Sequence, residues 1–493
     1  MKMALRWGAM ALGLAWSQPV IALSLHPLDE SDWALIERAE TLLGSAPPHF
    51  ERGGDIEQGI ALSQNLALDP FTRGLLEQRA PDWSLGLHGA VEAGVVYSKG
   101  RGMTMVDPPV DEVSPLSDQR WGMWDPSGGS GRGAMALRWD GPSWALRAAG
   151  EAQSGGGTNH GQVTDLEGRL LLGNQVVAAG RGKSYWGYGG HGAMVLSDSH
   201  RPFDRIAIGN QNPYQAWGLG PLRYEVGLAR LEANRTIPRP WWLGIHVEAQ
   251  PTERLEFALF RAIMMGGDGR PSPWPLDRFL RILSGVNIGQ PNASGVGDPG
   301  TDTSNSIAGF AMSYRVGGVK FYLEAGGEDE AKLMPSRPAV LVGFYRPGLA
   351  PEGRGDFRLE WMRTDSDGSN NWYRHHIYTT GYTFQSRLLG HHVGTNGSDL
   401  FLSYRVWGEQ GGWVELSVDA ERRMGSLPTA ERRTQTGIAG LWRLNPALAL
   451  QWMGGMERID NRGGQIRPNV TPVQDARGSE RLYRAAVSAL VQF

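Results

Sequence analysis

Alternation of apolar and polar residues is clearest in the last twelve residues of the chain. Counting back from Phe493, every second residue is apolar as far as Tyr483, and both ends of this series are aromatic. The other face is mixed and includes Arg484 and Gln492. Because successive side chains of a strand point to opposite faces, the pattern predicts a strand with one apolar face. A final strand with aromatic ends is typical of a transmembrane β-barrel, whose apolar face meets lipid.

The same alternation continues through most of the chain after Trp83. The clearest hairpins span 134–153, 242–261, 308–325 and 438–452. Charged residues recur on the polar side, where a water-filled lumen tolerates them: Glu248, Lys320, Glu324, Arg358, Glu360 and Glu415. At roughly 22–25 residues for each strand and its connection, the chain holds about 16–18 strands. We therefore predict an all-β fold, a large antiparallel transmembrane β-barrel over residues 81–493.

The lengths of the connections predict the sidedness of this barrel. With the C-terminus on the periplasmic side, the periplasmic turns are 251–254, 409–412 and 445–446. The external loops are then 262–306, 422–435 and 457–480. Transmembrane barrels have short periplasmic turns and longer external loops, so this alternation supports the fold. Between residues 328 and 398 the count is one strand out, and the sidedness of those loops stays open.

The N-terminal residues follow a different pattern. Residues 1–23 have a positive start, an apolar core and a small-residue cleavage site, which predicts a secretory signal peptide. Over residues 24–80 the apolar period becomes helical, with helices expected from about residue 30 to Gly44 and over 69–79. We expect a periplasmic α-helical region. It would be a cap under the pore or an interaction module, with a loosely packed extension as the alternative.

The composition argues against several other classes of protein. No apolar run of 18 or more residues occurs outside the N-terminus, which excludes a helical membrane protein. A net charge of -3 without a basic patch disfavours nucleic acid as a partner. The 69 Gly and 19 Trp, with no Cys, suit many strands and turns in a non-cytoplasmic setting. We expect a monomeric barrel surrounded by outer-membrane lipid.

Three phrases in the middle of the chain are similar to those of a known family. The first, within 181–202, combines an aromatic-Gly run with Leu-Ser-Asp and Arg-Pro. The second, within 261–271, contains Gly-Gly-Asp-Gly-Arg-Pro, and the third, within 373–394, begins with Tyr-Arg-His-His. In their order and spacing they resemble the Wzi family of capsule-assembly outer-membrane proteins. The resemblance implies an 18-stranded Gram-negative outer-membrane barrel with periplasmic helices. It also implies lectin-like attachment of capsular or extracellular polysaccharide to the cell surface, without catalysis.

Polysaccharide binding calls for aromatic faces and for side chains that hydrogen-bond hydroxyl or acidic groups. The candidate residues are Arg181, Lys183, Tyr185, Trp186, Tyr188, His200, Arg201, Asp268, Arg270 and Trp274. Each has a simpler interpretation, because Trp and Tyr of a barrel often form interface girdles and Gly-Asp-Gly often forms a turn. The alternative function is a porin-like channel for sugars or other small solutes, which differs in having an open lumen.

The histidines of the third phrase suggest metal binding or catalysis. His375 and His376 are adjacent, so on an extended strand they would point to opposite faces, which argues against a shared metal ion. An esterase would need an oriented Ser–His pair, and His392, Asn396 and Ser398 supply the residue types at chance-level spacing. We therefore expect no catalytic residues, no metal site and no cofactor, and we expect the histidines to hydrogen-bond in the lumen.

One further motif has a simple structural interpretation. Residues 182–184 match the second half of a phosphate-binding loop, but Val177 stands where the first Gly should be. The Gly-rich segment 180–192 is therefore predicted to be a turn or a plug that folds into the lumen.

Overall fold

The structure is a computed structural model. It describes residues 30–44, 56–80, 85–99, 128–155, 158–285, 304–328, 338–364, 372–423, 430–461 and 479–493. The predicted signal peptide, 1–23, lies outside the described residues.

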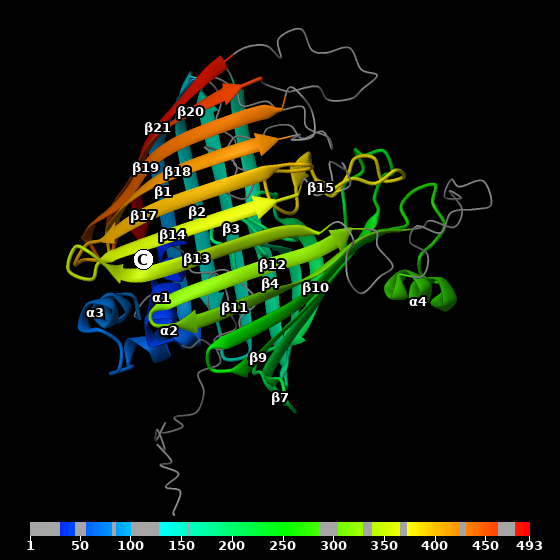
Figure 1. The fold of residues 1–493 in the computed structure, drawn as a ribbon, viewed down its shortest axis with the longest axis horizontal. Helices are drawn as coiled ribbons and strands as arrows, with labels where there is room; N and C mark the ends of the chain where they lie inside the picture. The colour runs from blue at the N-terminus through cyan, green and yellow to red at the C-terminus, as the bar shows by residue number, and fades with distance from the viewer. Residues whose placement is uncertain are drawn as a thin grey trace, which may run out of the picture.

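The described chain forms a closed antiparallel barrel (Figure 1). Its eighteen strands are β1 (Gly86–Lys99), β2 (Gly128–Asp140), β3 (Trp144–Gly155), β4 (Thr158–Leu172), β5 (Gln175–Gly182), β6 (Phe203–Asn210), β8 (Gly220–Arg230), β9 (Trp241–Thr252), β10 (Leu255–Met265), β11 (Ser304–Val316), β12 (Val319–Glu328), β13 (Ala339–Leu349), β14 (Gly355–Arg363), β17 (Ser398–Trp407), β18 (Trp413–Arg423), β19 (Glu431–Asn445), β20 (Leu448–Asp460) and β21 (Ser479–Gln492). Strand β1 pairs with β21 and closes the barrel. The short β7 (Tyr214–Ala216) adds a small hairpin to β8. The predicted fold is confirmed.

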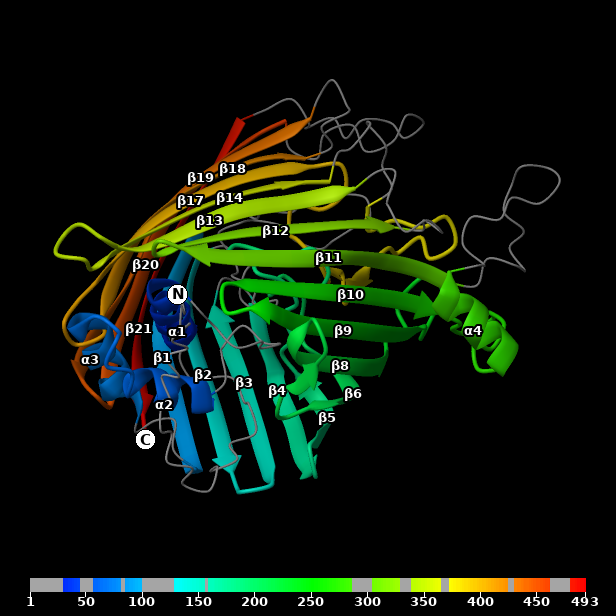
Figure 2. The same cartoon turned by 60° about the horizontal axis from the view of Figure 1, so that its bottom comes forward.

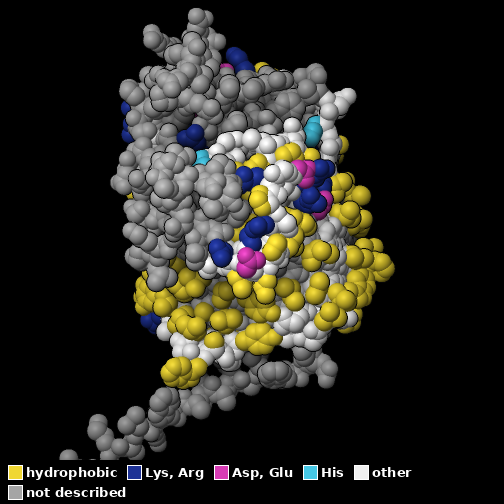
Figure 3. Space-filling view, turned by 90° about the vertical axis from the view of Figure 1, so that its right-hand side faces the viewer, with side chains coloured by type: hydrophobic (Ala, Val, Ile, Leu, Met, Phe, Trp, Pro, Cys, Tyr) yellow, Lys and Arg dark blue, Asp and Glu magenta, His cyan; other side chains and the backbone are white. Residues whose placement is uncertain are grey.

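The two faces of the barrel wall follow the predicted alternation. On β21, Tyr483, Val487 and Val491 are 38–47% exposed, whereas Leu482 and Arg484 are each 4% exposed. The exposed apolar side chains form a belt around the barrel, and Figure 3 shows hydrophobic side chains spread over one such stretch of the surface. Apolar side chains outside and polar ones inside are what a barrel in lipid requires.

The two ends of the barrel differ in the length of their connections. At the short-turn end, the turns predicted at 251–254, 409–412 and 445–446 are found at 253–254, 408–412 and 446–447. Most connections at the opposite, long-loop end are longer, and the loops predicted at 262–306, 422–435 and 457–480 are narrowed by their flanking strands to 266–303, 424–430 and 461–478. The one-strand discrepancy between residues 328 and 398 has a clear cause. The described part of 364–397 belongs to a long loop with two short strands, β15 (Thr383–Phe384) and β16 (Arg387–Leu388), and contributes nothing to the barrel wall.

Three helices precede the barrel: α1 (Glu30–Leu43), α2 (Ile56–Ser63) and α3 (Pro70–Arg79). Helices α1 and α3 match the predicted ones, and the eight-residue α2 was not predicted from the sequence. Leu35, Ile36 and Ala39 of α1 pack against Leu75 and other apolar residues of α2 and α3. None of the described helices has the length and hydrophobicity needed to cross a membrane.

The opposite, charged face of α1 lies against the inner wall of the barrel. Glu37 pairs with Lys320 at 2.9 Å, and Glu40 pairs with Arg315 at 3.3 Å. Arg38, which is 1% exposed, pairs with Asp356. Figure 2 shows these helices at the end of the barrel where the chain terminates. Helix α1 is thus held inside the short-turn end by buried ion pairs.

Candidate functional site

Two connections from the long-loop end fold into the barrel. These inner loops are 183–202, between β5 and β6, and 372–397, between β14 and β17. The hydroxyl of Tyr373 donates to the carbonyl of Met194 at 2.7 Å. Ser197 Oγ donates to a backbone carbonyl of the other inner loop at 2.6 Å. The two inner loops therefore form one body. Of the segment 180–192, which is predicted to be a turn or a plug, residues 183–192 fold inward and 180–182 end strand β5.

A buried carboxylate of the wall fastens the first inner loop. Glu324 on β12 accepts hydrogen bonds from the backbone N–H groups of Tyr188, Gly189 and Met194 at 2.9, 3.1 and 2.9 Å. Gly187 has a φ of +153°, and a Cβ there would overlap the Glu324 carboxylate. Glycine at this position therefore allows the backbone to approach the charge.

A second carboxylate extends this attachment. Glu360 on β14 accepts from the backbone N–H groups of Gly190 and His191, at 2.5 and 3.0 Å. It also accepts from the hydroxyl of Tyr322 at 2.7 Å. Buried carboxylates with several donors are strongly held, so the inner loop has a defined position against strands β12 and β14.

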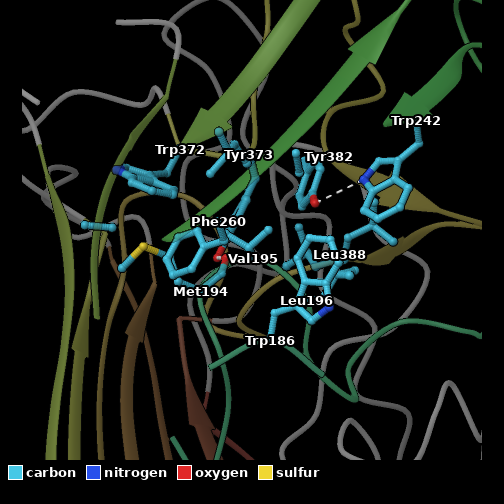
Figure 4. Packing of buried hydrophobic residues seen from close by; sticks show 14 of the residues in the cluster. Trp186, Met194, Val195, Leu196, Trp242, Phe260, Trp372, Tyr373, Tyr382 and Leu388 are labelled. Carbon is cyan, nitrogen blue, oxygen red and sulfur yellow. Dashed lines mark hydrogen bonds between the residues drawn. The ribbon is translucent and has the colours of Figure 1, made fainter. Parts of the chain in front are cut away.

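Aromatic side chains fill the space between the inner loops and the wall (Figure 4). The Trp186 ring stacks on His246 with centroids 5.2 Å apart and lies 5.7 Å from the Trp242 ring. Trp242 donates from its indole N–H to the hydroxyl of Tyr382 at 3.3 Å. Trp186 is only 1% exposed, so its faces are already covered by protein.

The sequence-predicted ligand residues therefore divide into groups. Tyr185, Trp186, Tyr188 and His200 are buried in the first inner loop. Burial lowers the pKa of His200 to about 4, so its ring is neutral near pH 7. Arg201 of the same loop donates to the side chain of Gln385 at 3.3 Å.

Two other predicted residues from this region lie elsewhere. Lys183 lines a cavity of about 490 Å³ between the inner loops and α1. Arg181 forms a two-pronged ion pair with Asp204 of the neighbouring strand, and the Asp204 side chain is 69% exposed. Arg181 thus faces away from the group formed by Tyr185, Trp186 and Tyr188.

The remaining predicted residues, Asp268, Arg270 and Trp274, lie in the connection that follows β10. Asp268 accepts from Arg239 Nε at 2.8 Å and lies 3.5 Å from Arg230 Nη2. The Trp274 ring meets Trp241 edge to face, with centroids 5.1 Å apart. The Arg230 guanidinium lies 5.3 Å from the centre of the Trp241 ring.

We call Arg230, Arg239, Trp241, Asp268 and Trp274 the Trp274 cluster. Its members are accessible: the side chains of Arg230 and Arg239 are 49% and 54% exposed, and Trp274 is 45% exposed. The cluster lies at the long-loop end, beside helix α4 (Leu276–Ser284). An aromatic face flanked by two cations and a carboxylate can stack on a sugar ring and hydrogen-bond its substituents.

Sequence reasoning missed Arg230, Arg239 and Trp241. They flank or belong to the connection 231–240, which meets the loop after β10 because β8, β9 and β10 are neighbours in the barrel. The strand order would have found them. Because β8, β9 and β10 are adjacent, the loop between β8 and β9 lies next to the loop that follows β10.

One prediction about the histidines was based on a wrong premise. His375 and His376 lie in an inner loop and not on an extended strand, and their rings lie 4.4 Å apart. The opposite-face argument therefore does not apply to them. His392, considered for a Ser–His pair, instead faces two carboxylates, with Nε2 at 3.2 Å from Asp399 and 3.1 Å from Glu421.

Comparison with known proteins identifies the family. The family model described as capsule assembly protein Wzi matches residues 122–466. This chain belongs to the Wzi family. The family and the apolar belt together place it in the outer membrane.

Two relatives of this Wzi-family chain show how far the similarity extends. An uncharacterised 55.8 kDa protein in the cps region of Klebsiella pneumoniae is 26% identical over 270 residues, which are 52% of this chain. The chain thus spans about half (50%) of the length of that relative. The solved structure of Wzi from Escherichia coli, an outer-membrane protein involved in group 1 capsule assembly and a carbohydrate-binding β-barrel, is 18% identical. The two structures match over 96% of this chain and 99% of the Escherichia coli chain, with a TM-score of 0.68. The fold is therefore shared.

Proposed function

We propose that this barrel holds capsular or extracellular polysaccharide at the cell surface by non-covalent, lectin-like binding and without catalysis. The observation that carries the proposal is the exposed Trp274 cluster at the long-loop end. Membership of the Wzi family supports a role in capsule assembly, and the Escherichia coli relative is described as binding carbohydrate.

The composition of the Trp274 cluster suits a sugar polymer. The face of Trp274 offers a surface for a pyranose ring, and Arg230 and Arg239 offer donors to hydroxyl or acidic groups. Asp268 holds both arginines in place and still has a side chain that is 34% exposed. Single contacts of this kind are weak, but a repeating polymer can engage many barrels, and its retention then grows by avidity.

The buried candidates act differently in this proposal. Tyr185, Trp186 and Tyr188 are at most 7% exposed, so they support the inner loop and do not stack on a ligand. Arg270, which is half-buried beside the cluster, remains a candidate contact together with Asp268 and Trp274. Of the two groups of candidates, the Trp274 cluster is therefore the proposed binding surface, and the first inner loop is not.

The state of the lumen argues against the alternative channel function. Within the described residues, the inner loops occupy part of the barrel near the long-loop end, beside a cavity of about 490 Å³, and α1 lies in the short-turn end. A porin-like pathway would need both to move. We also propose that the long-loop end is external and that α1 to α3 lie in the periplasm after removal of the signal peptide 1–23, as the short-turn rule predicts.

Direct binding tests the proposal. Purified protein in detergent is immobilised and exposed to surface polysaccharide from the cells that make it, with dextran as the neutral control polymer. We expect saturable binding of the cell's own polymer, with an apparent Kd that weakens when the polymer is cut into single repeat units. No binding of the intact polymer would contradict the proposal, and conductance in planar bilayers would then favour the channel.

A further inference from the structure

A second group of side chains meets inside the barrel, away from the Trp274 cluster. His191 comes from the first inner loop, His392 from the second, Asp399 from β17 and Asp419 from β18. All four are buried, with exposed fractions between 1% and 5%. One ligand-type atom from each lies within 4.8 Å of those of the other three.

The strand register explains why the carboxylates converge. Asp399 lies directly opposite Glu421 in the antiparallel pair β17–β18, and Asp419 is two residues from Glu421 on the same face. All three carboxylates therefore point into the lumen. His191 and His392 of the inner loops meet these carboxylates in the lumen. Glu360 fixes the backbone of His191 by accepting a hydrogen bond from its N–H group.

The separations between the atoms suit a small metal ion. His191 Nε2 lies 3.3 Å from Asp419 Oδ2 and 3.6 Å from Asp399 Oδ2. His392 Nε2 lies 3.2 Å from Asp399 Oδ2. With metal–ligand bonds of about 2.0–2.2 Å, the ligand atoms of a tetrahedral site lie roughly 3.3–3.6 Å apart. The widest pair, at 4.8 Å, needs a side-chain movement of about 1 Å to reach that spacing.

The charges of the group call for a cation. Asp399 Oδ1 and Asp419 Oδ1 are buried and have no hydrogen-bond partner among the described residues. Glu421 adds a third carboxylate, which Arg423 pairs at 2.6 Å. Like charges brought together in a buried site repel strongly, and a bound divalent ion offsets that repulsion.

The surroundings hold the imidazoles in place. The His191 ring stacks on Phe401 with centroids 3.7 Å apart and an angle of 8° between the planes. The rings of His392, at 4.8 Å and nearly perpendicular, and of His391, at 6.4 Å, are further neighbours. His191 and Phe401 also line the cavity of about 490 Å³, so the group borders open space inside the barrel. Ligands held by packing and by backbone hydrogen bonds are pre-organised for binding.

We propose that His191, His392, Asp399 and Asp419 bind a divalent transition-metal ion of the zinc class. Two imidazoles with two carboxylates favour zinc over calcium or magnesium, which prefer oxygen ligands only. The ion joins both inner loops to strands β17 and β18, so it locks the loops inside the barrel. This site is independent of the polysaccharide-binding surface.

The test uses the full mature chain, purified without a His tag and stripped of metal with a chelator. Zinc is added in a calorimetric titration, magnesium is titrated in parallel, and bound zinc is measured by mass spectrometry after dialysis. The variants are His392→Gln and Asp419→Asn, which keep side-chain size. His88→Gln, on β1 and outside the group, is the matched control. Heat-modifiable mobility on gels shows that each variant is a folded barrel.

We expect one zinc ion per wild-type barrel and per His88→Gln barrel, and at least a tenfold loss of affinity in the other two variants. Magnesium should not compete at equal concentration. Zinc should also raise the apparent Tm of the wild type by more than that of Asp419→Asn at the same zinc concentration. A folded wild-type barrel that binds no zinc overturns the proposal, and so does equal zinc binding by the wild type and both ligand variants.

Discussion

The carboxylate of Glu324 accepts a hydrogen bond from the backbone N–H of Tyr188 at 2.9 Å, although the two residues are 136 positions apart. Glu324 belongs to the barrel wall and Tyr188 to the first inner loop, so this contact joins the inner loop to the wall. The same carboxylate holds two further backbone N–H groups. The position of the inner loop thus depends on this buried side chain together with Glu360 on β14.

Replacing Glu324 should release the inner loop. In Glu324→Ala, three backbone N–H groups lose their acceptor, and a buried unsatisfied donor costs about 1–3 kcal/mol. We expect a folded barrel that shows frequent channel openings in planar bilayers, whereas the wild type stays closed. Glu253→Gln, an exposed residue of the turn after β9, is the control and should stay closed. Bilayer currents equal to those of the wild type would show that other contacts are enough to hold the loop.

Acid should weaken the attachment of α1. Burial alone would raise the pKa of Glu37, but Arg358 and Lys320 outweigh it and lower this pKa to about 2. Because the pKa in the unfolded chain is near 4.5, the stabilisation is complete above that pH and is lost as the pH falls toward 2. A difference of this size corresponds to roughly 3 kcal/mol.

The measurement is protease cleavage of the N-terminal helices as a function of pH, with an acid-tolerant protease. We expect wild-type cleavage to increase as the pH drops below 4.5. In Glu37→Gln it should be high at every pH, because Lys320 and Arg358 no longer share a carboxylate on α1. Glu77→Gln, whose side chain is 60% exposed on α3, should behave like the wild type. An unchanged pH profile in Glu37→Gln would contradict this account.

Removing the aromatic face of the Trp274 cluster should weaken polymer binding. An aromatic contact of this kind is worth about 0.5–1.5 kcal/mol, so Trp274→Ala should weaken the affinity for a short fragment about two- to tenfold. The matched control is Trp217→Ala, because Trp217 is fully exposed (101%) but lies in the turn between β7 and β8, at the short-turn end. Equal losses in both variants would mean that exposed tryptophans bind the polymer non-specifically.

Trp186→Ala should have the opposite profile. Trp186 is buried against Trp242 and His246, and loss of a large buried aromatic costs about 3–5 kcal/mol. We expect a lower Tm and looser inner loops, with fragment binding by the Trp274 cluster unchanged. Scanning calorimetry and the fragment titration separate the two effects. Loss of binding with an unchanged Tm would instead return Trp186 to the ligand site.

The barrel itself could be predicted from the sequence because lipid and lumen impose opposite preferences on alternate residues. Tyr483 and Val487 outside, with Arg484 inside, follow this rule directly. The strand count from the sequence is one out between 328 and 398, because 372–397 forms an inner loop and not part of the wall. A loop buried in the lumen needs apolar contacts and hydrogen bonds as much as a wall strand does. Its composition therefore resembles that of a wall strand.

The functional surfaces could be predicted only in part. Trp186 and Trp274 look alike in the sequence, and only the fold shows that one is covered and the other exposed. Asp399 and Asp419 could be placed on the polar faces of neighbouring strands. Their meeting with His191 and His392 depends on how the inner loops fold back, which a local pattern does not encode.

The central claim is tested most directly by measuring surface polysaccharide on cells that lack this protein. Cell-bound and released polymer are quantified separately, and the strain is complemented with the wild type, Trp217→Ala or Trp274→Ala. We predict a normal total amount of polymer that is shed into the medium, with retention restored by the wild type and Trp217→Ala and only partly by Trp274→Ala. An unchanged cell-bound fraction in the strain without the protein would contradict the account.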